Sequence, residues 1–109
     1  MRALEIAILR QDPLRRAAAL KLLGTSLRLS GRSREALEPI RGALQICANA
    51  SDALLEAELL HEAGVAHAEC GDHAAAREMW TTALSAFERI GAQVQAQRVR
   101  SVMESQPQA

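Results

Sequence analysis

Aromatic side chains are nearly absent from this chain of 109 residues, which contains one tryptophan, one phenylalanine and no tyrosine. Proline is also scarce, with three residues, whereas alanine is abundant throughout the chain. Alanine is the best helix former, and its small side chain lets neighbouring helices approach closely. The composition therefore favours an all-α fold, and the length fits one domain with an extended core.

Cysteine, long apolar runs and net charge are lacking as well. The two cysteines, Cys47 and Cys70, cannot build a disulfide framework, which indicates a reduced, intracellular protein. The amino-terminal apolar run is short and interrupted, unlike that of a signal peptide. No stretch approaches the roughly 18–20 apolar residues that a membrane span needs. The net charge of zero argues against binding to nucleic acid or to a membrane surface, so we expect a soluble cytoplasmic protein.

The charges are nevertheless unevenly distributed along the chain. Residues 1–50 carry nine basic and four acidic side chains, whereas residues 51–109 carry four basic and nine acidic ones. Asymmetry of this size often marks a contact surface, either within one chain or between chains.

The most informative feature that is present is an internal repeat with a period of forty residues. When residues 17–50 are aligned with residues 57–90, eight of the 34 positions are identical, and most of these are small or apolar. A fixed period of this length indicates a stack of supersecondary units, each of which buries its apolar face against the next. Such stacks usually bind other molecules and rarely catalyse reactions.

Turn and cap signals divide this single domain, residues 1–109, into about five helices. The predicted units are a partial repeat (1–12), two repeats (13–51 and 52–91) and a closing helix (92–104). Within them, apolar spacing predicts helices over residues 2–10, 13–30, 34–48, 52–70, 73–89 and 92–104. We expect Asp12, Ser33 and Asp72 to act as N-caps. Pro39 removes one backbone hydrogen bond, so a slight kink or a late start of its helix is expected.

Small and apolar residues recur at corresponding positions of the two repeats. They are Leu20, Leu23, Gly24, Leu27, Gly31, Ala36, Ile40 and Ala43 in the first, and Leu60, Ala63, Gly64, Gly71, Ala76, Trp80 and Ala83 in the second, where His67 corresponds to Leu27 and Asp72 follows the turn glycine. This pattern resembles the tetratricopeptide repeat (TPR) signature. The resemblance implies an all-α, right-handed solenoid of antiparallel helix pairs, in which Gly24 and Gly64 allow close approach of the paired helices. The longer period is similar to that of repeats in bacterial signal-transducing regulators, especially the carboxy-terminal arrays of actinobacterial transcription activators.

No group of residues has the spacing of a catalytic or metal site. His61 and His67 are about 120° apart on a helix, too far round to share a metal ion, and Val65 stands where a zinc-protease helix would need a second histidine. No phosphate-binding glycine loop, nucleophile elbow or useful carboxylate pair is present. We therefore expect no catalytic residue, no metal and no cofactor, and we predict that Cys47 and Trp80 lie in the core.

The concave surface of a helical stack remains as the candidate site. The family's groove positions, carried onto this sequence, give Lys21, Thr25, Arg28, Glu58, His61, Val65 and Glu69. The lysine–asparagine clamp with which some relatives bind a peptide carboxylate is absent. In the alternative interpretation, Lys21 and Arg28 only pair with acidic residues of the neighbouring helix, which contributes about 0–1 kcal/mol for each exposed pair.

These features together predict a non-catalytic protein- or peptide-binding module that belongs to a bacterial regulatory or signalling protein. The alternative function is a ligand-sensing domain whose groove takes a small molecule and switches an attached effector. A weak homodimer, or an upstream domain that covers the first helix, is also expected, because neither end of the stack has a dedicated polar cap and the two halves carry opposite charge. The charge-driven part of such a dimer should weaken with salt.

Overall fold

A computed structural model describes residues 12–106, which form five α-helices and no strands. The helices are α2 (Pro13–Leu29), α3 (Ser33–Ala50), α4 (Ala53–Glu69), α5 (His73–Arg89) and α6 (Gln93–Glu104). The all-α prediction is thus confirmed over this part of the chain. The predicted helix at residues 2–10 and the end of the carboxy-terminal tail lie outside the described residues.

Aspartate N-caps start three of the helices. The side chains of Asp12, Asp52 and Asp72 accept hydrogen bonds from backbone N–H groups three residues further on, at 2.9, 3.0 and 3.1 Å. Each bond satisfies one of the N–H groups that the first helical turn leaves free. Ser33, in contrast, was wrongly predicted as a cap: it is the first residue of α3, and its hydroxyl donates to Glu69 Oε1 at 2.6 Å.

Proline in α3 neither delays nor ends the helix. Pro39 lies inside the continuous helix Ser33–Ala50, so the expected late start does not occur.

A residue in the left-handed conformation stands in every turn between the described helices. Three of these residues are Gly31, Gly71 and Gly91, with φ of 81°, 86° and 76°, and the fourth is Ser51, with φ of 60°. They follow one another at intervals of twenty residues, half of the sequence repeat. Glycine adopts this conformation without a steric penalty, whereas serine does not.

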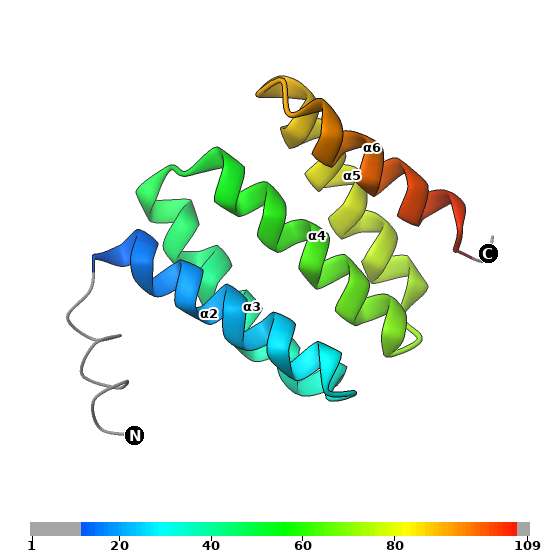
Figure 1. The fold of residues 1–109 in the computed structure, drawn as a ribbon, viewed down its shortest axis with the longest axis horizontal. Helices are drawn as coiled ribbons and strands as arrows, with labels where there is room; N and C mark the ends of the chain where they lie inside the picture. The colour runs from blue at the N-terminus through cyan, green and yellow to red at the C-terminus, as the bar shows by residue number, and fades with distance from the viewer. Residues whose placement is uncertain (1–11, 107–109) are drawn as a thin grey trace.

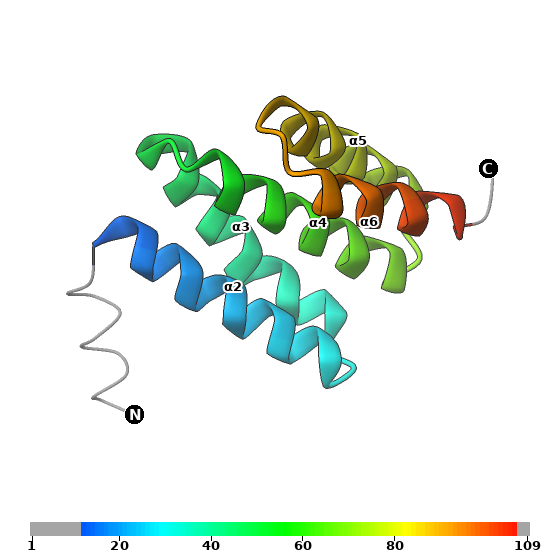
Figure 2. The ribbon, with the colours of Figure 1, turned by 45° about the horizontal axis from the view of Figure 1, so that its top comes forward.

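The turns reverse the chain, so α2, α4 and α6 run in one direction and α3 and α5 in the other (Figure 1). Each helix packs against the next along the chain, and α2 also contacts α4. In the turned view of Figure 2, α3 and α5 lie behind the layer that contains α2 and α4, and α6 lies in front of α5. One buried cluster joins α2, α3 and α4, and a second joins α4, α5 and α6.

The second cluster depends on a glycine at the contact of α4 with α5. A Cβ atom on Gly64 would lie 2.3 Å from Nε1 of Trp80, which is only 2 % exposed. The indole Nε1 donates to the carbonyl oxygen of His61 at 3.2 Å. Gly24 has the same role in the first cluster, where an added Cβ would lie 2.6 Å from Ile40 Cγ1. The expected close approach of helices at both glycines is therefore present, and Trp80 is a core residue as predicted.

Candidate functional site

Charged and polar side chains join α2 to α4 across one face of the molecule. Arg28 Nε lies 3.1 Å from Glu62 Oε1, and its Nη1 lies 3.4 Å from Glu69 Oε2. Thr25 donates to the same Glu62 oxygen at 3.2 Å. Lys21 Nζ lies 4.0 Å from Glu58 Oε1. We refer to these six side chains as the α2–α4 ion-pair network.

The network uses most of the polar groups that were predicted to bind a partner. The side chains of Arg28 and Glu62 are only 16 % and 19 % exposed, so their charges are directed to each other. This arrangement matches the alternative interpretation, in which the charges pair between neighbouring helices. Val65 lies apart from the network, because it is partly buried against the cluster of α4, α5 and α6.

Beside the network, a cavity of about 230 Å³ opens between α2, α4 and α6, and Phe87 of α5 also lines it. We call it the three-helix cavity, and its lining residues are Lys21, Glu58, His61, Glu62, Phe87, Gln95 and Arg98. Lys21, Glu58 and Glu62 belong to the ion-pair network. Among the described residues Arg98 has no ion-pair partner and its side chain makes no hydrogen bond, so its guanidinium group is available to a ligand.

His61 forms the wall of the cavity next to Arg98. Burial lowers the pKa of His61, the cations Arg28, Arg98 and Lys21 lower it further, and the carboxylate of Glu62 opposes them. The imidazole is therefore neutral at pH 7, with one nitrogen that donates and one that accepts. Its backbone carbonyl is held by Trp80, which fixes this segment of α4 against α5.

A shallower hollow of about 460 Å³ continues from His61 along α6. Its lining residues are His61, Gln97, Arg98, Ser101, Val102 and Ser105. The lining of this hollow thus contains cationic and neutral hydrogen-bond donors and no carboxylate. An anionic group matches such a surface better than a cationic one does.

Residues of α6 were missing from the predicted site, although the repeat contained the signal for them. Moving Glu58 and His61 forward by one period of the sequence repeat gives Arg98 and Ser101. The period therefore marks α6 as a third groove-lining helix, in which a cation replaces the carboxylate of α4.

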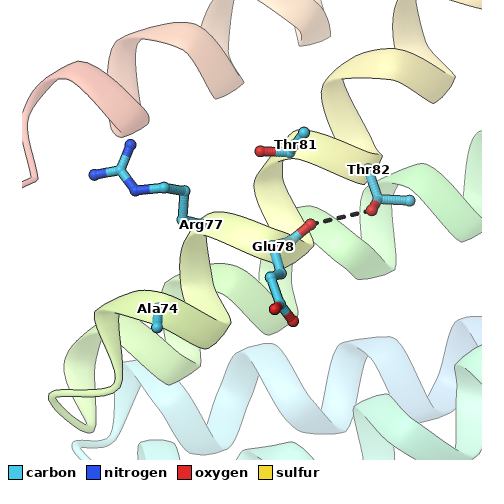
Figure 3. Close-up of a pocket in the computed structure, with 5 residues that line it drawn as sticks. All are labelled: Ala74, Arg77, Glu78, Thr81 and Thr82. Carbon is cyan, nitrogen blue, oxygen red and sulfur yellow. Dashed lines mark hydrogen bonds between the residues drawn. The ribbon is translucent and has the colours of Figure 1, made fainter.

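A larger hollow lies elsewhere on the described surface, on α5. It measures about 650 Å³ and is lined by Ala74, Arg77, Glu78, Thr81 and Thr82. Figure 3 shows that all five side chains project from one helix, with the Thr82 hydroxyl bonded to the backbone oxygen of Glu78. A surface formed by a single helix cannot enclose a ligand, so we assign no site to it.

The other candidate groups give no reactive centre in the described part of the chain. Burial raises the pKa of the Cys47 thiol, with smaller contributions from Asp52 and Glu56, so Cys47 is a core residue with an unreactive thiol. Between residues 12 and 106, no cluster of three or more histidine, cysteine or acidic side chains is arranged to hold a metal ion. None of the helices in this range has both the length and the apolar character of a membrane span.

No protein-family model, curated protein or solved structure matches the chain.

Proposed function

We propose that this chain is a non-catalytic module of the tetratricopeptide type that binds a protein or peptide on the face formed by α2, α4 and α6. In this proposal the helices are successive antiparallel pairs of a right-handed solenoid. The sequence signature, its regular repeat and the close approach of helices at Gly24 and Gly64 support it. The resemblance to repeats of bacterial regulators supports a place in a regulatory or signalling protein.

The observation that carries the proposal is the exposed guanidinium group of Arg98 beside the neutral imidazole of His61. The neighbouring cations of α2 already have carboxylate partners, whereas Arg98 has none among the described residues. A carboxylate of the partner would therefore gain a charge-assisted hydrogen bond at Arg98 without breaking an existing ion pair. The partner's anchor would be an aspartate or glutamate side chain or a carboxy terminus.

The small size of the enclosed cavity favours the anchor of a peptide over a drug-sized molecule bound within it. Pockets for drug-sized ligands measure about 300–1,000 Å³, whereas the three-helix cavity measures about 230 Å³. It accommodates one side chain or a chain terminus, and the adjoining hollow along α6 is open to solvent. A ligand-sensing domain remains the alternative function, and a metabolite that raises the unfolding temperature with one-site behaviour would favour it.

Selection of displayed peptides against the chain, followed by affinity measurements, tests the proposal. Arg98→Glu should weaken the selected peptides by about tenfold or more, because it removes a hydrogen bond to a charged group. Arg89→Glu is the matched control, since Arg89 is also exposed but lies at the end of α5. Equal affinities of the two variants for every selected peptide would contradict the proposed site.

Arg28→Glu is unsuitable as a binding variant. It would place a third carboxylate beside Glu62 and Glu69, so any loss of binding could reflect a damaged junction between α2 and α4.

A further inference from the structure

The outer face of α2 carries a row of residues with two exposed leucines that no described part of the chain covers. Leu22 and Leu29 are 71 % and 73 % exposed, and they lie seven residues apart on one side of the helix. Arg15, Ala19 and Ser26 complete the row, so that its members alternate at spacings of four and three residues. This is the spacing of a heptad seam, which packs against another helix. We call these five residues the α2 row.

Comparison of the two repeats shows that the α2 row stands where a junction between helices is expected. Leu22 and Leu29 correspond to Glu62 and Glu69 of α4, at a distance of one period. In α4 these two positions receive Arg28 and Ser33 from the preceding helix pair. On α2 the same positions carry leucine, so a surface that packs on α2 there must present apolar side chains in place of basic ones.

The opposite end of the helix stack does not offer such a surface. In α4, Ala57, Leu60 and Gly64 pack toward α5. The corresponding residues of α6 are Gln97, Arg100 and Glu104, which are polar, and Arg100 pairs with Glu88. The positions that would continue the stack beyond α6 therefore carry polar side chains, in place of the uncapped end that was expected. Stacking α6 of one copy on α2 of another would bury leucines against polar groups.

The charges around the α2 row also disfavour a second copy placed with like ends together. The helix itself has four basic residues and no acidic one. At the two ends of the row, Asp12 pairs with Arg15 and Glu35 with Arg32. Arg16 and Arg34 have no ion-pair partner within residues 12–106. Two such faces brought together would repel each other.

We infer that the α2 row docks an amphipathic helix of a partner protein whose apolar stripe is flanked by acidic residues. The stripe packs on Leu22 and Leu29, while the acidic flanks meet Arg16 and Arg34, which have no ion-pair partner among the described residues. This surface is separate from the three-helix cavity and does not depend on the ligand proposed there. From Arg15 to Leu29 the row is about 21 Å long at 1.5 Å per residue, which matches a helix of about four turns.

Two designed peptides, each long enough to form a helix of about four turns, test the inference by fluorescence anisotropy. Both carry leucine at the a and d positions of a heptad and are cross-linked on the outer side to hold the helix, and they differ only in glutamate or lysine flanks. The glutamate peptide should bind at least about tenfold more tightly than the lysine peptide at low salt, and the difference should shrink as salt screens the charges. The double variant L22S/L29S should lose about tenfold or more in affinity. Two control variants should bind the glutamate peptide as tightly as the parent chain does. They are Val94→Ser, at a site on α6 that is 64 % exposed, and Arg98→Glu in the three-helix cavity.

Four results would overturn the inference. The first is equal binding of both peptides or no binding of either at about 100 µM. The second is binding that survives the double variant while the circular dichroism spectrum shows an intact fold. The third is a homodimer in sedimentation that the double variant dissociates, since the occupant of the row would then be a second copy of the chain. The fourth is peptide binding that appears only after residues 1–11 are deleted, since the chain's own amino-terminal segment would then be the occupant.

Discussion

The contact between Gly64 and Trp80 makes the packing of α4 on α5 testable with one methyl group. In the variant Gly64→Ala the new Cβ would lie 2.3 Å from Nε1 and 2.5 Å from Cδ1 of Trp80. Heavy atoms cannot approach so closely, so the indole or the helix must move. The indole has little freedom, because it is buried and donates a hydrogen bond to the His61 carbonyl.

Three effects decide the size of the change in the free energy of unfolding. Overpacking of a close contact is destabilising by about 1–3 kcal/mol, and loss of the indole hydrogen bond adds about 0.5–1.5 kcal/mol. Alanine in place of glycine within a helix returns about 1 kcal/mol. The net destabilisation is therefore about 0.5–3.5 kcal/mol, and each kcal/mol lowers the Tm of a domain of this size by several degrees.

Gly42→Ala is the matched control. Gly42 also lies inside a helix, but an added Cβ would meet only Leu20 Cδ1, at the ordinary distance of 3.6 Å. This variant should be more stable than the parent chain by up to about 1 kcal/mol. Urea unfolding followed by circular dichroism and by tryptophan fluorescence measures both variants. If Gly64→Ala raised stability as much as Gly42→Ala does, the described contact of α4 with α5 would be refuted.

Three further predictions follow from single residues. Ser51→Gly should raise the Tm, because Ser51 has φ of 60° at a turn position where the other described turns have glycine; the gain is up to about 1 kcal/mol, and an unchanged or lower Tm would contradict it. Burial lowers the pKa of His61 below 6.5 in the folded chain, so the unfolded chain takes up the proton first and stability should fall as the pH drops below about 6.5. His61→Gln should flatten this pH dependence of urea unfolding, and an unaltered slope would contradict the lowered pKa of His61. Cys70→Ser leaves Cys47 as the remaining cysteine, and this buried thiol should react with a thiol reagent only as fast as the protein opens; rapid labelling of the folded variant would show that Cys47 is accessible.

Local signals in the sequence predicted the helices and most of their bounds, because cap and turn residues lie within a few residues of the helix ends. Asp12 and Asp72 cap their helices as local cap signals indicate, and Gly31, Gly71 and Gly91 lie in the turns. Ser33 failed as a predicted cap because its hydroxyl is bonded to Glu69, 36 residues further along the chain. Capping rules consider only residues that are close in the sequence, so they do not predict this hydrogen bond.

The candidate site was less predictable for the same reason. The repeat pattern predicted that Lys21 and Arg28 lie on the face that α2 shares with α4. Only the packing of these helices shows that both cations form ion pairs, with Glu58, Glu62 and Glu69. Arg98 became a candidate through the opposite finding, the lack of an ion-pair partner for its guanidinium group among the described residues. Which charges are paired depends on distances between helices, and a repeat pattern does not contain these distances.

Amide hydrogen exchange of the complex with a selected peptide tests the proposed binding face most directly. With the peptide at saturation, exchange should slow in the segments of α4 around His61 and of α6 around Arg98, where the cavity and the adjoining hollow lie. The surface of α5 from Ala74 to Thr82 should exchange as in the free chain. Protection confined to that surface of α5, with none on α4 or α6, would contradict the account.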